Sequence, residues 1–266
     1  MSNNSLKIEY KIYKKGDGIV NQDAYGCIDN FAFVIDGATD VFNKNILKKK
    51  DDVKWYVGYL KHKLIQNYDN NRTLKSILKD TINEIYIKIN KKIKIDNISE
   101  YYLPTFSISM IRNNKNCIEY FILGDVSIGY VKNKKPVLLY DTRISKFSDL
   151  NRKRIKKNQS NKKKIYQETR KYANTINGYP IGSVSGKGID RGIEGRIKVD
   201  DNILLFSDGI LDYIKEDLNT LLDLLKPENK RQCLKKINIF YNDKNQYASS
   251  GRPKLNDDKT VLLLKL

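Results

Sequence analysis

The order of the apolar segments constrains the fold of this chain more than any other feature of its sequence. Two stretches, at 53–64 and 74–89, repeat apolar residues at intervals of three and four, which is typical of amphipathic helices. Short apolar runs typical of strands precede and follow them, at 5–13, 31–36, 105–111, 117–123, 128–131 and 137–140. A strand, a helical stretch near 212–225, a second helix opened by Pro227 and a last strand follow from residue 202 onward. This order predicts an α+β fold in which helices cover antiparallel sheets.

The length and composition are those of a folded chain. It has 266 residues, of which 40% are hydrophobic, so a sizeable core is possible. Neither an internal repeat nor a Pro/Gly/Ser-rich linker divides it, and we expect a single domain over 1–266. The N-terminal segment lacks the apolar core of a signal peptide, and no apolar run approaches the roughly 20 residues of a membrane-spanning helix. We therefore expect a cytoplasmic monomer that makes no membrane contact.

Nearly half of the excess of basic residues lies in one segment. The chain carries 50 Lys and Arg against 31 Asp and Glu, a formal charge of +19. Residues 151–171 hold ten Lys and Arg and one Glu, and they contain too few apolar residues to bury much surface, which favours a solvated helix or a mobile loop. A docking surface for an acidic or phosphorylated partner is the second interpretation. We do not expect nucleic-acid binding, because Tyr166 is the only aromatic residue among these charges.

Aspartates gather at the ends of the predicted strands, several of them beside glycine. If these strand ends converge, the carboxylates repel one another and retain protons unless a cation compensates their charge. Carboxylate oxygens are ligands that Mg²⁺ and Mn²⁺ prefer, and the sequence has no Cys/His cluster of the kind that binds zinc or copper. The sequence therefore predicts a divalent-metal site built from strand-end aspartates, which are Asp23, Asp36, Asp125, Asp208 and Asp257.

Five segments resemble, in the same order, the motifs of the PPM or type 2C metal-dependent serine/threonine protein phosphatases, in a divergent form close to the bacterial members. These segments are NQDAYG, FVIDGATD, FILGDVSIGY, LLFSDGILDYI and DDKTVLLL, and the resemblance covers about residues 6–266. It implies an α-β-β-α sandwich and the hydrolysis of phosphoserine or phosphothreonine on proteins by a water activated at a binuclear Mn²⁺ or Mg²⁺ site. The phosphoprotein substrate would be the product of a Ser/Thr kinase.

The same resemblance assigns roles to the core-metal residues. Asp36 would bridge the two core metals, and the carbonyl of Gly37 would bind one of them. Asp208 and Asp257 would complete the first-metal site, with Asp258 as the alternative if the alignment is shifted by one residue. The resemblance thus places Asp36 and Asp208 at the catalytic centre.

The remaining roles lie around this centre. Asp23 would hold waters of the second metal, and Asp125 with Asp212 resembles the pair that binds a third, weaker metal. The basic segment belongs to an insert at about 141–195, where the family has its flap, a variable element implicated in substrate choice.

Departures from the family pattern concern the binding of the substrate phosphate. Many relatives have an arginine for this purpose five residues before the aspartate of the first motif, and Gly18 occupies that position here. Lys14, Lys15 and Arg252 are the candidate substrate-binding replacements. A second functional hypothesis therefore remains open, in which a catalytically weak or inactive domain of this fold binds a phosphorylated or acidic partner.

Overall fold

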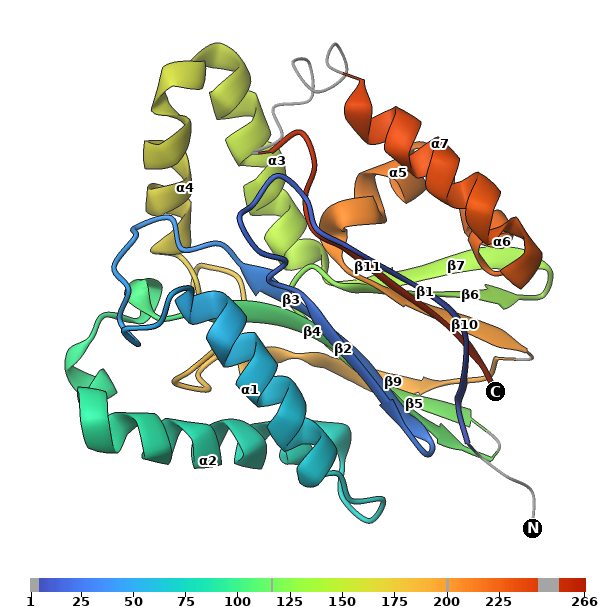
Figure 1. Ribbon diagram of the computed structural model, residues 1–266, viewed down its shortest axis with the longest axis horizontal. Helices are drawn as coiled ribbons and strands as arrows, with labels where there is room; N and C mark the ends of the chain where they lie inside the picture. Colours follow the sequence, from blue (N-terminus) through green and yellow to red (C-terminus); the bar gives the residue numbers. More distant parts are fainter. Residues whose placement is uncertain (1–4, 116, 200, 244–253) are drawn as a thin grey trace.

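The computed structural model describes residues 5–115, 117–199, 201–243 and 254–266. Two antiparallel sheets stack face to face, and helices cover both outer faces (Figure 1). Apolar side chains from the two sheets form one buried cluster between them, which includes Val34, Ile122, Leu205 and Leu262. The predicted α-β-β-α sandwich is confirmed.

The first sheet has the strand order β1-β11-β10-β6-β7. It joins the beginning and the end of the chain, because β1 and β11 pair from Lys7 opposite Lys265 to Lys14 opposite Lys259. Its strands are β1 (Lys7–Lys14), β6 (Ser127–Lys132), β7 (Lys135–Tyr140), β10 (Asn202–Phe206) and β11 (Lys259–Lys265).

The second sheet has the order β2-β3-β4-β5-β9, with the short strand β8 paired to β4. The predicted hairpin between 105 and 123 is present as β4 and β5. The sequence did not predict β2, β8 or β9. The strands are β2 (Ala24–Ile28), β3 (Phe31–Ala38), β4 (Thr105–Asn114), β5 (Cys117–Leu123), β8 (Gly182–Ser183) and β9 (Ile193–Ile197).

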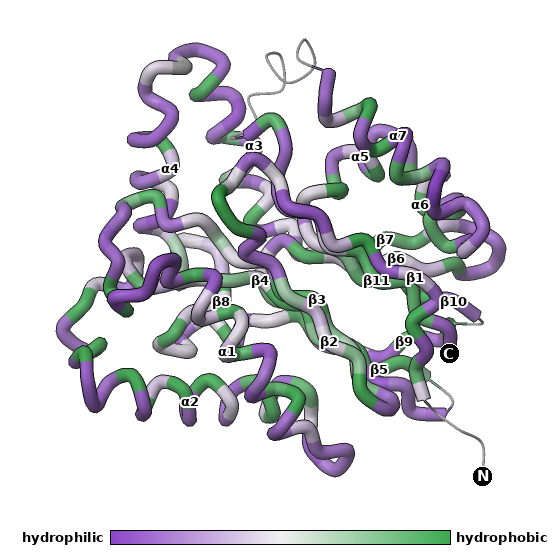
Figure 2. Tube along the Cα trace, viewed as in Figure 1, coloured by the Kyte–Doolittle hydropathy of each residue, from purple (hydrophilic) through white to green (hydrophobic). Residues whose placement is uncertain are grey.

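Two long helices cover the second sheet, as predicted. In α1 (Asp52–Gln66), the side chain of Asp51 caps the first turn by accepting from the N–H of Lys54. Thr73 caps α2 (Leu74–Ile93) in the same way, through the N–H of Ser76. The apolar face of each helix packs on the sheet, and Figure 2 shows hydrophobic residues concentrated along the strands between the layers.

Three shorter helices cover the first sheet: α5 (Leu211–Glu216), α6 (Thr220–Leu224) and α7 (Lys230–Asn242). The helical stretch predicted near 212–225 is interrupted after Glu216. There the Asp217 carboxylate accepts from the N–H of Asn219 at 2.9 Å, a local turn that competes with helical hydrogen bonding. The helix predicted after Pro227 begins with a turn of 3₁₀ helix at Pro227–Asn229 and continues as α7.

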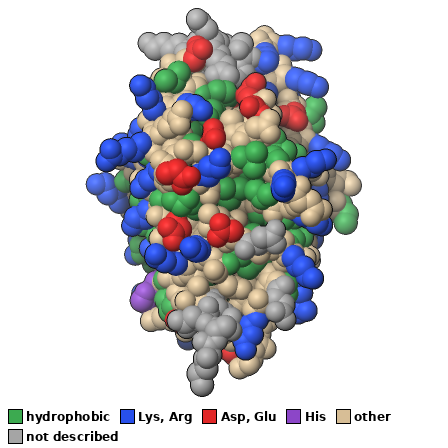
Figure 3. All heavy atoms as spheres, turned by 90° about the vertical axis from the view of Figure 1, so that its right-hand side faces the viewer, with side chains coloured by type: hydrophobic (Ala, Val, Ile, Leu, Met, Phe, Trp, Pro, Cys, Tyr) green, Lys and Arg blue, Asp and Glu red, His purple; other side chains and the backbone are tan. Residues whose placement is uncertain are grey.

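The basic segment is helical. α3 (Thr142–Lys157) and α4 (Lys162–Arg170) lie side by side and project from the sandwich, and we call residues 142–170 the helical flap (Figure 1). A small apolar cluster below it includes Ile144, Tyr179 and Ile181. Basic side chains also occur elsewhere, and Figure 3 shows them distributed around the margin of the face that α6 and α7 cover. No helix among the described residues is both long enough and apolar enough to cross a membrane.

Candidate active site

Four of the predicted aspartates line one cavity of about 160 Å³ beside the helical flap. Each lies at the end of a different strand. Asp36 lies near the end of β3, Asp125 between β5 and β6, Asp208 directly after β10, and Asp257 shortly before β11. Because these strands belong to both sheets, the stacking of the sheets brings together residues that are far apart in the sequence. The predicted convergence of strand ends is present.

Asp36 and Asp208 are in direct contact. The backbone N–H of Asp208 donates to Oδ2 of Asp36 at 3.3 Å. Burial raises the pKa of both carboxyls well above their ordinary range, and the negative charge of neighbouring aspartates raises it further. Such a cluster is unfavourable unless protons or cations neutralise it.

Asp23 lies deeper, with only 1% of its surface exposed. Its Oδ2 accepts a hydrogen bond from the hydroxyl of Thr260 at 2.8 Å, whereas its buried Oδ1 has no hydrogen-bond partner among the described residues. Burial raises the pKa of this carboxyl to about 7, although the Thr260 hydrogen bond acts in the opposite direction. An unpartnered buried carboxylate oxygen is costly, so this atom is a natural acceptor for a bound water.

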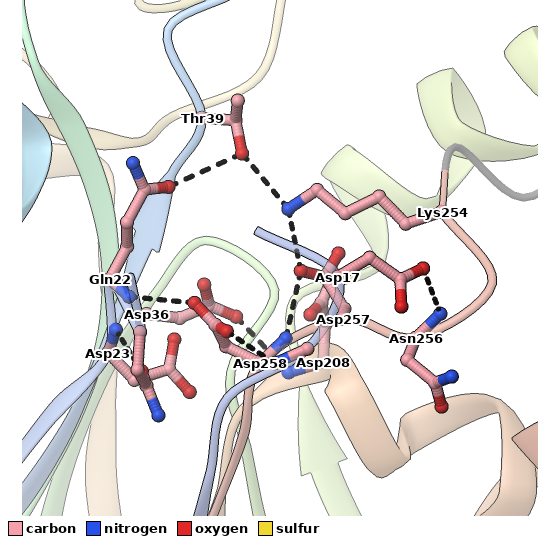
Figure 4. A network of polar contacts seen from close by, with 12 residues as sticks. Asp17, Gln22, Asp23, Asp36, Thr39, Asp208, Lys254, Asn256, Asp257 and Asp258 are labelled. Carbon is pink, nitrogen blue, oxygen red and sulfur yellow. Dashed lines mark hydrogen bonds and ion pairs between the residues drawn. The ribbon is translucent and has the colours of Figure 1, made fainter. Parts of the chain in front are cut away.

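Asp257 and Asp258 have different environments, which bears on the alternative alignment. The Asp258 carboxylate accepts from the backbone N–H groups of Gly16 at 2.8 Å and Gln22 at 2.7 Å, so it holds the loop after β1. The Asp257 carboxylate lines the cavity with Asp36 and accepts from Nζ of Lys254 at 2.9 Å. The arrangement therefore favours Asp257 as the cavity residue (Figure 4).

Asp125 is held by a serine of the adjacent strand. The Ser107 hydroxyl donates to its Oδ1, and the N–H of Asp125 donates back to the Ser107 oxygen at 3.1 Å. Gly124 has φ +86°, and a Cβ there would lie 2.1 Å from the Ser107 hydroxyl oxygen, so the turn requires glycine. Burial raises the pKa of Asp125, and its hydrogen bond from Ser107 lowers it.

Asp212 has a cationic partner from the helical flap. Both of its carboxylate oxygens accept from Nη2 of Arg152 on α3, each at 2.8 Å. Asp212 lines an adjoining cavity of about 420 Å³ that Asp125, Asp208 and Asp257 also line. Asp212 therefore shares a cavity with Asp125, its predicted partner, but its carboxylate is engaged by an arginine.

Two of the three basic residues predicted for phosphate binding, Lys14 and Lys15, are described by the structure and do not line the cavity. Nζ of Lys14 donates to Oδ1 of Asn238 on α7 at 3.0 Å, and Lys15 is exposed; neither lines the cavities described above. Lys14 is the last residue of β1, an edge strand of the first sheet, and Lys15 follows it. Arg252 lies outside the described residues.

Sequence reasoning missed two basic residues that do line the cavity, Arg170 at the end of α4 and Lys254 shortly before β11. Arg170 is one of ten basic residues in its segment, and nothing in the local sequence distinguishes it from the others. Lys254 had one available signal, its position three residues before Asp257, which allows the ion pair that forms.

The donor set of the cavity suits a hard divalent cation. Among the described residues, no three or more His, Cys, Asp or Glu side chains already converge as a metal site. Protein donors engage the carboxylates instead: Lys254 on Asp257, Ser107 on Asp125 and the N–H of Asp208 on Asp36. The candidate ligands among the described lining residues are oxygen atoms, neighbouring aspartates raise the pKa of Asp36 and Asp208, and Asp23 keeps an unpartnered oxygen. These are properties that Mn²⁺ or Mg²⁺ would satisfy.

Solved structures of serine/threonine phosphatases match nearly the whole chain. The catalytic domain of PstP, solved in complex with two manganese ions, is 14% identical, with a TM-score of 0.60 over 98% of this chain and 97% of that one. Stp1 of Staphylococcus aureus is 14% identical, with a TM-score of 0.60 over 98% and 95%. PppA, a key regulatory component of the T6SS in Pseudomonas aeruginosa, is 12% identical, with a TM-score of 0.60 over 98% of both chains. No protein-family model and no curated protein matches the sequence. The chain has the fold of the type 2C serine/threonine phosphatases, as its motifs predicted.

Proposed function

We propose that this protein is a metal-dependent phosphatase that hydrolyses phosphoserine or phosphothreonine on proteins. The observation that carries the proposal is the lining of one cavity by Asp36, Asp125, Asp208 and Asp257, each from a different strand end. The fold that this chain shares with a phosphatase solved with two manganese ions supports the proposal. Divalent cations would compensate the negative charge of these carboxylates and would activate the water that attacks the phosphoryl group.

The residues in and around the cavity would have different roles in binding the metal ions. Asp36, Asp208 and Asp257 would hold two core ions, with the carbonyl of Gly37, and Asp23 would accept from a water in the second site. A Cβ at Gly37 would lie 2.6 Å from the carbonyl oxygen of Gln22, so the backbone here is packed as only glycine allows. When bound, Mn²⁺ or Mg²⁺ would offset the carboxylate charge and lower the pKa of a coordinated water.

The proposal includes a third, weaker ion near Asp125 and Asp212. It also includes a cytoplasmic location, a monomeric state, and a phosphoprotein substrate made by a Ser/Thr kinase. The helical flap lines part of the cavity, and its exposed basic residues would favour acidic sequences around the phosphorylated residue.

Two observations favour a second candidate, a weak or inactive domain that binds a phosphorylated or acidic partner. Gly18 leaves the first motif without its phosphate-binding arginine, and Arg152 occupies the carboxylate of Asp212. Either feature would lower turnover without preventing the fold from binding an anionic partner.

Hydrolysis of an aryl phosphate and of phosphoserine and phosphothreonine peptides distinguishes the two candidates. We expect turnover with Mn²⁺, none with a chelator, and none in Asp36→Asn under either condition. Asp201→Asn is the matched control, since Asp201 is exposed and lines neither site cavity. Metal-independent turnover, or full activity of folded Asp36→Asn, would refute the proposed mechanism. Phosphopeptide binding without turnover would support the second candidate.

A further inference from the structure

Two cationic side chains meet beside the carboxylate cavity at Thr39. Nζ of Lys254 donates to the Thr39 hydroxyl at 3.1 Å, and Nη2 of Arg170 donates to the Thr39 carbonyl at 3.4 Å. Thr39 directly follows β3, and both cationic residues line the cavity that Asp36 lines. Figure 4 shows Lys254 reaching across to Thr39 and Asp257.

Lys254 occupies the side of the site where Gly18 leaves space. Gly18 lines a cavity of about 410 Å³ together with Thr39 and Lys254, and Thr39 and Lys254 also line the carboxylate cavity. The ammonium group therefore lies at the boundary between the space that residue 18 leaves open and the aspartates. Its side chain is 28% exposed, so an incoming anion can reach it.

Arg170 has hydrogen-bonding capacity that the protein does not use. Its guanidinium has five N–H donors. Its hydrogen bonds go to the Thr105 hydroxyl and the Thr39 carbonyl, and it also interacts with the Tyr179 hydroxyl, so its partners are neutral groups. None of the ion pairs found in the described part of the chain includes Arg170. Its charge nevertheless reaches the site, since it lowers the pKa of Asp125. A residue whose only purpose was to neutralise the aspartates would be expected to pair with one of them.

We infer that Arg170 and Lys254 together bind the phosphoryl group of the substrate, in place of an arginine at position 18. The planar guanidinium would bind two phosphoryl oxygens, and the lysine would act as a point charge on the opposite side of Thr39. The inference deepens the proposed function and rests on it for the identity of the substrate. It also assigns the flap helix α4 a part in binding the phosphoryl group itself.

Binding of inorganic phosphate to the Mn²⁺-loaded protein, measured by titration calorimetry, tests the inference. We expect Arg170→Ala and Lys254→Ala each to weaken phosphate binding by about tenfold or more, as for the loss of one charge-assisted hydrogen bond. Arg170→Lys should recover only part of the loss, because an ammonium cannot bind two oxygens in one plane. Lys171→Ala is the matched control, since Lys171 is exposed, adjacent to Arg170 and absent from the cavity lining.

A second measurement separates phosphate binding from a structural effect. Lys254 now competes for the Asp257 carboxylate, so Lys254→Ala should bind Mn²⁺ at least as tightly as the wild type while it binds phosphate more weakly. Arg170→Ala should leave Mn²⁺ affinity within about threefold, a free-energy change below 1 kcal/mol. In aryl phosphate hydrolysis, both variants should raise KM more than they lower kcat.

The outcomes distinguish this inference from the proposed function. Phosphate affinity and KM that stay at wild-type values in both variants would overturn the inference and leave metal-dependent hydrolysis standing. A wild-type protein that loads Mn²⁺ but binds no phosphate would also overturn it. Phosphate binding that depends on Arg170 and Lys254 in a protein without turnover would support the inference and refute the proposed enzyme.

Discussion

The Asp36 carboxylate accepts a hydrogen bond from the backbone N–H of Asp208, so a strand end of the second sheet contacts a strand end of the first. The site is therefore formed by the packing of the sheets, and no single motif contains it. A change in this packing would move the carboxylates relative to one another, whereas loss of one carboxylate should affect the proposed metal binding without unfolding the sandwich. The two aspartates before β11 provide a test of this separation.

We predict opposite effects for Asp257→Asn and Asp258→Asn. Asp257→Asn should abolish Mn²⁺-dependent turnover with little loss of stability, because this carboxylate faces the cavity. Asp258→Asn should lower the free energy of unfolding by about 1–3 kcal/mol, since an amide cannot accept from both the Gly16 and the Gln22 N–H groups. Denaturant unfolding with a chelator and Mn²⁺ titration of each variant make the comparison. The reverse pattern would show that Asp258 is the metal residue.

The ion pair between Arg152 and Asp212 leads to a second prediction. Arg152→Ala should free the Asp212 carboxylate and strengthen binding of an additional Mn²⁺ by about tenfold, the effect of removing one competing charge contact. Arg154→Ala is the matched control on the same helix, because Arg154 pairs with Glu168 and lines neither site cavity. Calorimetric titration measures the number of ions and their affinities. An unchanged weak site in Arg152→Ala would contradict a metal role for Asp212.

The elements that could be predicted are those whose side chains meet one continuous apolar surface. Val53, Val57, Leu60 and Leu64 recur at helical spacing because α1 lies flat on a sheet. Strand β9 escaped prediction because it is an edge strand with mostly exposed side chains, so its sequence IEGRI shows no apolar alternation. The break after Glu216 depends on a hydrogen bond that the Asp217 carboxylate accepts from the N–H of Asn219, which apolar spacing does not reveal.

The residues of the candidate site that could be predicted are the aspartates at strand ends. Asp36, Asp125 and Asp208 stand out because each follows an apolar strand and lies beside glycine. Arg170 does not stand out, and the spacing of Lys254 from Asp257 predicts only their ion pair, because the approach of both cations to Thr39 depends on how the flap and the last loop fold over the cavity. Because the chain has 50 Lys and Arg residues, the sequence alone does not show which of them has a specific partner.

The stability of the metal-free protein should fall as pH rises. The folded-state pKa of Asp23 is about 7 and its ordinary value is 3.8, so between these values the folded state keeps a proton that the unfolded state releases. The free energy of unfolding then decreases with pH in this window, by up to about 1.4 kcal/mol per pH unit for one group. The raised pKa values of Asp36, Asp125 and Asp208 act in the same direction.

The measurement for this prediction is denaturant unfolding at pH 4 to 7 with a chelator present. Asp23→Asn has no carboxyl to titrate, so its free energy of unfolding should fall less steeply than that of the wild type. Asp201→Asn should keep the wild-type slope. Parallel slopes for wild type and Asp23→Asn would show that the Asp23 carboxyl is ionised in the folded protein throughout this range.

The exposed lysines at the tip of the helical flap should affect substrate choice and not the chemical step. Lys156, Lys157 and Lys163 are exposed and line neither site cavity. Replacing all three by Gln should keep aryl phosphate turnover within about twofold and lower kcat/KM for acidic phosphopeptides, because these charges act at long range. Screening over about 8 Å at physiological ionic strength should make the peptide effect shrink as salt is added.

Replacing Lys7, Lys115 and Lys265 by Gln removes the same charge at the opposite end of the sandwich and should leave peptide kinetics unchanged. A collapse of aryl phosphate turnover in the flap variant would place these lysines at the phosphoryl group, whereas unchanged peptide kinetics at low salt would show that the flap charge is solvated and does not select substrates.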